Sequence, residues 1–182
     1  MSHYVSSYWL NKLGLGKEYS HENVKNWIRN IPGRDIFNLE RLFVPVNRTN
    51  QHWTFLCVDF TSQEIFYLDS LVKTKGKYAT YSTRCMEAVS RYLEDEWNET
   101  RRKSSGMPLP KKEWKCVDTN LKCVPQQNNG SDCGVFVCVF AEHFSRRDDC
   151  LDFNQDIMPE QRVKIALSII NKDYFWRFFG DK

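Results

Sequence analysis

Residues 125–138 read Pro-Gln-Gln-Asn-Asn-Gly-Ser-Asp-Cys-Gly-Val-Phe-Val-Cys, and their character changes at Asp132. The residues before that point favour tight, non-helical backbone. From Cys133 onward the chain is apolar over a length that suits a buried helix. Ser131 or Asp132 stands where a cap belongs, so Cys133 would lie in the first turn of this helix. Unpaired backbone N–H groups and the positive end of the helix dipole favour a thiolate there, which is the nucleophilic form of cysteine.

Gln127 stands upstream of Cys133, across a glycine-containing turn that can fold its side-chain amide back beside the thiol. The amide and the Cys133 N–H would then form a pair of donors for a developing oxyanion. A structural alternative remains open, because a cysteine at the start of an apolar helix is commonly a small buried hydrophobic residue. A base near the thiol distinguishes a nucleophile from that alternative.

The chain contains four histidines, so the search for a base is short. His3 and His21 lie in polar N-terminal sequence. His143 follows Cys133 in the same predicted helix at roughly 15 Å along its axis, which is too far for proton transfer. The remaining candidate is His52, which begins an apolar, aromatic run.

Two strand-like runs, 52–60 and 65–70, are joined by a short polar connection and predict an antiparallel hairpin. If the hairpin folds at 61–63, Asp69 falls opposite position 54 or 55, and His52 and Asp69 meet at the same end. An acid beside a histidine fixes its tautomer and stabilises the imidazolium. The alternative is that both side chains are simply solvated at the ends of their strands.

The remaining elements are predicted from the spacing of apolar residues. The pattern predicts helices at 21–28, at 85–97 and from Pro159 onward, and strands at 41–46 and 114–124. The basic run Arg101–Lys103 and the Ser, Gly and Pro residues after it predict a solvated loop, with nuclear targeting or contact with an acidic substrate as the lesser alternative. The order helix, strand, hairpin, helix, strand, helix, helix predicts an α+β fold.

The composition is that of one globular domain of 182 residues. A net charge of +3 is too small to argue for a nucleic-acid partner. The seven cysteines form no CxxC pair, which argues against a zinc site and favours free thiols in a reducing compartment. No apolar run approaches the length of a membrane span, and the first residues lack the apolar segment of a signal peptide. We therefore expect no metal, cofactor, nucleic acid or membrane as partner.

The blocks at 125–127 and 130–134 resemble the nucleophile signature of the Ulp/sentrin-specific protease family, the SUMO-deconjugating cysteine peptidases. His52-Trp53 and Leu68-Asp69-Ser70 match the other two catalytic blocks of that family, in the same order along the chain. The similarity covers about residues 5–170 and also runs through 24–27, 42–46 and Met158-Pro159.

The resemblance implies a papain-like cysteine peptidase fold, with the nucleophile helix packed on a small antiparallel sheet. It implies cleavage after the C-terminal Gly-Gly of a ubiquitin-like modifier, with SUMO as the expected one, for deconjugation from lysine or for precursor processing. Cys133 would attack the carbonyl, and His52, oriented by Asp69, would transfer the proton. Gln127 and the Cys133 N–H would bind the oxyanion.

Trp53 matches the family tryptophan that lies over the Gly-Gly tail, where a flat indole can cover a channel wide enough for glycine. Its alternative is a plain core aromatic. The partners implied are SUMO and its conjugates, bound by a monomer. The location implied is intracellular and reducing, in the nucleus or the cytoplasm.

Both ends of the chain depart from the family pattern. Trp9 stands 43 residues before His52, closer than the tryptophan of the family's Trp-Leu-Asn-Asp motif. We expect Trp9 to be a core aromatic, and the single domain 1–182 to lack the family's first helical segment and its first substrate-contacting tryptophan. The tail at 171–182 is strongly aromatic and unlike the family's usual ending, so it either packs on the domain or is exposed.

Three alternatives remain open. The chain could be a catalytically impaired, protease-like SUMO-binding module with an incomplete substrate channel. It could transfer acyl groups, as the related bacterial effector acetyltransferases do, although those usually carry Glu where this chain has Asp69. It could also act on NEDD8 or ubiquitin, because these modifiers share the Gly-Gly tail with SUMO.

Overall fold

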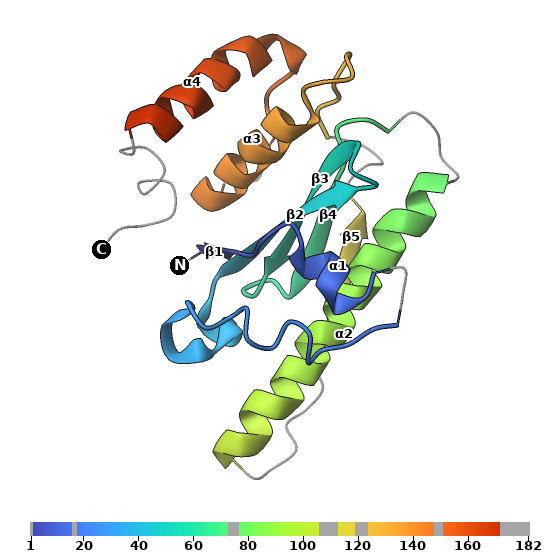
Figure 1. Cartoon of the computed structure of the whole chain (residues 1–182), viewed down its shortest axis with the longest axis vertical. Coiled ribbons are helices and arrows are strands. Elements are labelled where there is room, and N and C mark those ends of the chain that lie inside the picture. Colours follow the sequence, from blue (N-terminus) through green and yellow to red (C-terminus); the bar gives the residue numbers. More distant parts are fainter. Residues whose placement is uncertain are drawn as a thin grey trace.

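The computed structural model describes residues 2–15, 18–72, 77–105, 113–118, 124–147 and 151–171. A five-stranded sheet in the order β1-β2-β3-β4-β5 forms its centre. Its strands are β1 (Ser2–Tyr4), β2 (Arg41–Arg48), β3 (His52–Asp59), β4 (Glu64–Leu68) and β5 (Lys115–Asp118). Its helices are α1 (Trp9–Leu13), α2 (Lys77–Ser105), α3 (Cys133–Arg146) and α4 (Met158–Asn171), with short 3₁₀ turns at Pro32–Arg34, Ile36–Asn38 and Gln155–Ile157. Figure 1 shows α3 and α4 on one side of the sheet and α1 and α2 on the other.

The expected α+β class is confirmed, and the sheet is mixed. Strands β2, β3 and β4 pair antiparallel, as predicted, whereas β1 and β5 pair parallel to their neighbours at the two edges. Helix α2 crosses over between β4 and β5, and such a crossover returns the chain to the same end of the sheet. The expected antiparallel sheet is therefore found only in the centre.

The central hairpin has the register that the sequence predicted. Asp59 pairs with Glu64 and Phe55 pairs with Leu68, so the next residue, Asp69, lies at the end where β3 begins. Because strand side chains alternate between faces, Phe55 belongs to one apolar core and its neighbour Leu56 to the other.

Each face of the sheet has its own core. On the α3 side, fully or nearly fully buried aromatic and aliphatic residues pack together: Phe43, Phe55, Leu68, Phe136, Phe140 and Met158. On the α2 side the core includes Trp9, Leu10, Leu56, Val89, Tyr92 and Leu93. Trp9 is fully buried against Tyr92, which agrees with the expectation of a core aromatic. Removing this much apolar surface from water is the main favourable term for folding.

The prediction of a helix at 21–28 is wrong, although apolar residues that it placed on the buried face are indeed buried. Residues 22–30 form successive turns, although Val24 and Ile28 are buried as the helical pattern required. Short helices are marginal by themselves. The conformation of this segment is set by its side-chain contacts with α2, which include the hydrogen bonds of Tyr19 and His21 described below. It does not have the continuous backbone hydrogen bonds of a helix.

The loop predicted from Arg101 begins too early, because α2 continues to Ser105. The residues of this last part are compatible with helix, and Gly106 and Pro108 are the first strong helix breakers. Strand β5 begins close to the predicted start, and the predicted continuation over 119–123 lies outside the described residues.

Helix α4 begins next to Pro159 as predicted, yet much of its apolar surface faces solvent. Val163, Leu167, Ile169 and Ile170 are all exposed. The aromatic tail from residue 172 lies outside the described residues. Among the helices that the structure describes, none combines the length and the apolar character needed to cross a bilayer.

Candidate active site

Cys133 is the first residue of α3 and is 7% exposed. Its placement in the first turn was predicted from the sequence, which changes at Asp132 from polar turn residues to an apolar run. Asp132 occupies the N-cap position with φ −96° and ψ 0°, but its side chain makes no capping hydrogen bond. The predicted cap is therefore correct in position, and the predicted cap by its carboxylate is wrong.

The carboxylate of Asp132 is used by the loop before α3. It accepts hydrogen bonds from Asn129 Nδ2 at 2.6 Å, from Gln155 Nε2 at 2.6 Å and from Arg162 Nε at 2.9 Å. The hydrogen bond from Asn129, together with those from Arg162 and Gln155, lowers the pKa of Asp132 against the opposing effect of burial. Arg162 also donates to the Ser131 carbonyl at 2.7 Å, so α4 holds the loop that presents Cys133.

His52 and Asp69 meet at the end of the hairpin. His52 is the first residue of β3, and its Nε2–H donates to Asp69 Oδ1 at 2.6 Å. Asp69 is 2% exposed, and its Oδ1 also accepts from the Leu71 N–H at 2.8 Å. The acid therefore fixes the ring, and Nδ1 is the nitrogen left for exchanging a proton. The expected contact between these two side chains is present.

Trp53 connects the start of β3 with the start of α3. A Cβ placed on Gly134 would lie 3.8 Å from Trp53 Cδ1, which is ordinary van der Waals contact. The residue after His52 thus packs against the residue after Cys133. Trp53 is half-buried.

Gln127 is buried and held at three points. Its backbone N–H donates to the Ser70 carbonyl at 2.7 Å, its Oε1 accepts from Ser70 Oγ at 2.7 Å, and its Nε2 donates to the Asn129 carbonyl at 2.6 Å. The amide is thereby fixed between the turn before Cys133 and the end of β4. One of its two N–H groups remains for another acceptor.

The sequence did not single out three residues that shape this region. Ser70 stands in the block that carries Asp69, and Gln126 donates from Nε2 to the Asp69 carbonyl at 2.9 Å. A signal for both existed, since each adjoins a residue that the motifs identified. Arg162 had none, because it contacts Asp132 from a helix 30 residues further along the chain.

The other described histidines lie elsewhere. His143 stacks on Phe153 with ring centroids 5.0 Å apart, and His3 belongs to β1. His21 faces α2: its Nε2 is 2.7 Å from Glu96 Oε2 and its Nδ1 is 3.7 Å from Glu99 Oε2. The hydrogen bond with Glu96 raises the pKa of His21 against the opposing effect of burial.

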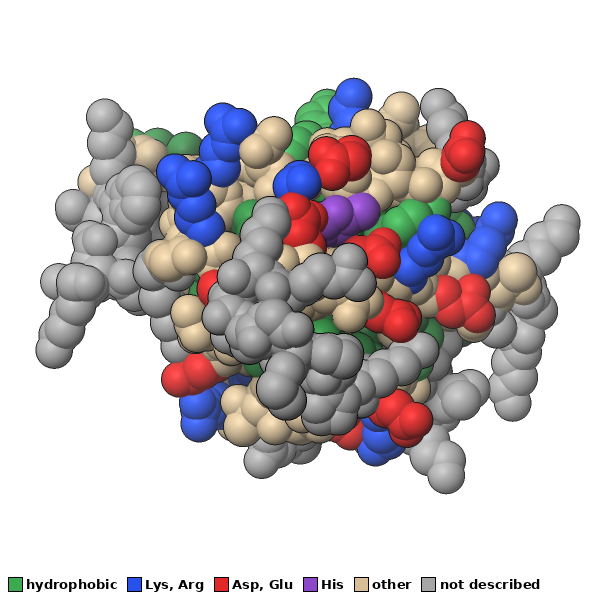
Figure 2. Space-filling view, turned by 90° about the horizontal axis from the view of Figure 1, so that it is seen from below, with side chains coloured by type: hydrophobic (Ala, Val, Ile, Leu, Met, Phe, Trp, Pro, Cys, Tyr) green, Lys and Arg blue, Asp and Glu red, His purple; other side chains and the backbone are tan. Residues whose placement is uncertain are grey.

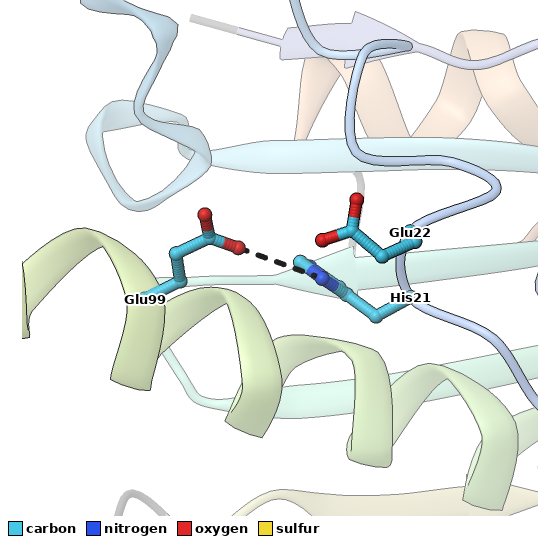
Figure 3. Close-up of side chains that lie close together, drawn as sticks. All are labelled: His21, Glu22 and Glu99. Carbon is cyan, nitrogen blue, oxygen red and sulfur yellow. Dashed lines mark ion pairs between the residues drawn. The ribbon is translucent and has the colours of Figure 1, made fainter.

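Within the described ranges, His21, Glu22 and Glu99 also form a group with the spacing of metal ligands (Figure 3). Lys25 Nζ is already 2.9 Å from Glu22 Oε1 and 2.8 Å from Glu99 Oε1. The two carboxylates therefore bind the ammonium group, and the cluster ties residues 21–25 to α2. On the face seen from below, acidic and basic side chains are interspersed around a histidine (Figure 2). The described part of that face therefore presents no continuous basic surface.

A cysteine at the start of a helix, packed against a sheet whose rim carries a bonded histidine and aspartate, has the arrangement of a papain-like cysteine peptidase. Residues 3–173 match the Ulp1 protease family, C-terminal catalytic domain. The chain belongs to this family.

The relatives agree with this assignment. Over 170 residues the chain is 34% identical to human sentrin-specific protease 2, covering 93% of this chain and 26% of that protein. It is 29% identical to the ubiquitin-like-specific protease ESD4 of Arabidopsis thaliana, covering 92% of this chain and 32% of the relative. The chain thus spans about a quarter to a third of their length.

The fold is similar to that of the C-terminal Ulp1 protease domain solved in complex with Smt3, the yeast ortholog of SUMO. The TM-score is 0.73 at 24% identity, over 93% of this chain and 68% of that one.

Proposed function

We propose that this domain is a cysteine peptidase that cleaves after the C-terminal Gly-Gly of a ubiquitin-like modifier, with SUMO as the modifier. The observation that carries the proposal is the 2.6 Å bond between His52 and Asp69 at the rim of the sheet, next to the contact of Trp53 with the first turn of α3. The names of the relatives supply the substrate class, since they are sentrin-specific and ubiquitin-like-specific proteases.

The proposed chemistry assigns one role to each of these side chains. The Cys133 sulfur forms a bond to the carbonyl carbon of the terminal glycine, and His52 takes the thiol proton. Gln127 Nε2 and the Cys133 N–H bind the resulting oxyanion. His52 returns the proton to the departing lysine amine or peptide nitrogen as the C–N bond breaks, which leaves a thioester. Water then attacks the thioester carbon, and the carboxylate of the modifier and the free thiol are released.

Asp69 keeps the imidazole of His52 in the orientation that this exchange needs. Trp53 covers the glycine tail, because a flat ring leaves room for two residues without side chains. The partners are SUMO and its conjugates. The site of action is a reducing compartment inside the cell, in the nucleus or the cytoplasm, where thiols stay free.

The proposal is tested by covalent capture. SUMO, NEDD8 and ubiquitin, each carrying a C-terminal electrophile, are incubated with the chain, and the adduct is located by mass spectrometry. We expect a SUMO adduct on Cys133, its loss in Cys133→Ser, and its retention in Cys138→Ser, a matched change on the same helix. Capture that persists in Cys133→Ser would contradict the assigned nucleophile.

The same panel separates the alternatives. Capture of NEDD8 or ubiquitin without SUMO would replace the proposed substrate. SUMO binding without capture would show a binding module in place of a peptidase.

A further inference from the structure

Ser70 follows Asp69 directly after β4 and is 1% exposed. Both its backbone and its side chain contact Gln127. The Ser70 carbonyl accepts from the Gln127 N–H at 2.7 Å, and Ser70 Oγ donates to Gln127 Oε1 at 2.7 Å. The mechanism proposed above uses the nitrogen end of this amide, and the hydroxyl of Ser70 is bound to the other end.

The direction of the Gln127 amide follows from its neighbours. The Asn129 carbonyl lies 2.6 Å from one end of the amide and can only accept, so this end must be the nitrogen. The oxygen then faces Ser70, whose hydroxyl can donate to it. If the amide rotated by half a turn, its oxygen would face the Asn129 carbonyl, and two acceptors would lie at hydrogen-bond distance without a proton between them.

The hydroxyl of Ser70 matters because Gln127 is buried. A buried amide oxygen without a hydrogen-bond donor costs free energy. Without the Ser70 hydroxyl, the Gln127 side chain would therefore shift to a position where its oxygen accepts another hydrogen bond. An oxyanion donor is effective only when it is already in place as the charge develops. Gln127 Nε2 has one N–H group bound to the Asn129 carbonyl and the other left for substrate. Because the amide is planar, the directions of both N–H groups are set once Oε1 is fixed.

The corner after β4 therefore serves both halves of the site. Asp69 binds His52, and Ser70 binds Gln127. The side chain of Gln126 secures this corner, because its Nε2 donates to the Asp69 carbonyl at 2.9 Å and its Oε1 accepts from the Val72 N–H at 2.9 Å.

We propose that Ser70 is the positioning residue of the oxyanion donor: its hydroxyl holds the Gln127 amide with the nitrogen toward the substrate carbonyl. This inference rests on the proposed peptidase function. Ser70 does not contact substrate and acts only through Gln127.

The test compares two reactions of Cys133 in the wild-type chain and in Ser70→Ala. Hydrolysis of a SUMO C-terminal amide substrate passes through an oxyanion, whereas alkylation of the thiol by iodoacetamide forms none. We expect Ser70→Ala to lower kcat by about tenfold to a hundredfold, as loss of a supporting contact does, with KM nearly unchanged. The alkylation rate should stay close to that of the wild type. In Gln127→Ala, the further change Ser70→Ala should have little additional effect on kcat.

Tyr67→Phe is the matched control. It removes a buried hydroxyl from β4, three residues before Ser70, where Tyr67 pairs with Thr54 at 2.9 Å in the other core, and kcat should be unchanged. If Ser70→Ala does not fold, Ser70→Cys keeps the shape with a weaker donor and should show the same selective loss of kcat.

Wild-type kcat in Ser70→Ala or Ser70→Cys would overturn the inference, as would additive losses with Gln127→Ala or an equal fall in alkylation. A wild-type chain that hydrolyses no modifier substrate would overturn the proposed function and this inference with it. Wild-type hydrolysis that Ser70→Ala leaves unchanged would overturn the inference alone.

Discussion

The side chain of Asp132 shows how a single residue beside Cys133 keeps its loop in shape without capping the helix. Its carboxylate is directed at Asn129, Gln155 and Arg162, so it does not bind the first N–H groups of α3. Those N–H groups carry the positive end of the helix dipole. Because they are left without a side-chain anion, their field acts on Cys133, the residue that follows.

Gln127→Ala should lower kcat on the order of a hundredfold to a thousandfold, because the proposed oxyanion donor would act chiefly on the transition state. KM should change little. Steady-state hydrolysis of a SUMO C-terminal amide substrate measures both constants, and Gln161→Ala on α4 provides a glutamine control. If only KM rose, Gln127 would bind substrate without stabilising the oxyanion.

Trp53→Ala should act in the opposite way, by raising KM about tenfold, which is the size expected for the loss of one aromatic contact. The expectation follows from its half-buried position against Gly134, beside the proposed nucleophile. Trp53→Phe, which keeps a flat ring, should restore most of the affinity. An unchanged KM in Trp53→Ala, with reduced thermal stability, would show a core aromatic in place of a channel wall.

The sequence identified Cys133, His52 and Asp69 as candidates because each belongs to a local pattern. Cys133 starts an apolar run, and His52 and Asp69 end two runs joined by a short turn, so periodicity alone brings them to the helix start and to the sheet rim. The roles of Asp132 and Arg162 could not be found in this way. Their contact depends on how α4 docks, and no periodicity within either segment encodes that.

At the scale of elements, too, the sequence predicted those helices and strands that local periodicity determines and missed the features that depend on tertiary contacts. The β3–β4 hairpin and helices α2 to α4 have strong periodicity and were expected, whereas the parallel pairing of β1 with β2 is set by tertiary contacts. Residues 22–30 have the apolar spacing of a helix but form turns, because side chains tied to α2 outweigh a weak local propensity. Element type follows from sequence where local and tertiary preferences agree.

Helix α4 holds the loop that precedes Cys133. Arg162 is the contact, since it donates to the Asp132 carboxylate and to the Ser131 carbonyl. Arg162→Ala should lower the free energy of unfolding by about 1–3 kcal/mol, because a buried carboxylate loses a donor. Denaturant unfolding near neutral pH measures this. Lys164→Ala on the same helix removes only the exposed pair with Glu160 and should have little effect.

The pH dependence of the difference in unfolding free energy between wild type and Arg162→Ala identifies the cause of that difference. The pKa of Asp132 is lowered in the folded chain, so the stabilisation is present above its usual value of 3.8 and is lost as the pH falls through the folded pKa. The difference between wild type and Arg162→Ala should therefore be constant near neutral pH and shrink in acid. A difference that stayed the same in acid would place the effect of Arg162 in packing and not in its bond to the carboxylate.

At the scale of the whole molecule, polar bonds and buried apolar side chains together hold the N-terminal segment against α2. Tyr19 donates to Asp95 at 2.6 Å, His21 is bonded to Glu96, and Lys25 pairs with Glu99. The buried Val24 and Ile28 complete the contact. Since the segment has no regular backbone ladder over 22–30, these side chains set how firmly it is held.

His21 makes this attachment sensitive to pH. The hydrogen bond with Glu96 raises its pKa above the usual 6.5, so its contribution to stability is complete below that pH and is lost as the pH rises through the folded pKa. The melting temperature of the wild type should therefore fall more than that of His21→Gln between about pH 6 and about pH 9. His3→Gln is a control of opposite sign, because burial lowers the pKa of His3, and its removal should steepen the fall with rising pH. Equal slopes in wild type and His21→Gln would show that the charge of His21 does not hold the segment, leaving Lys25, Tyr19 and the two buried aliphatic side chains to do so.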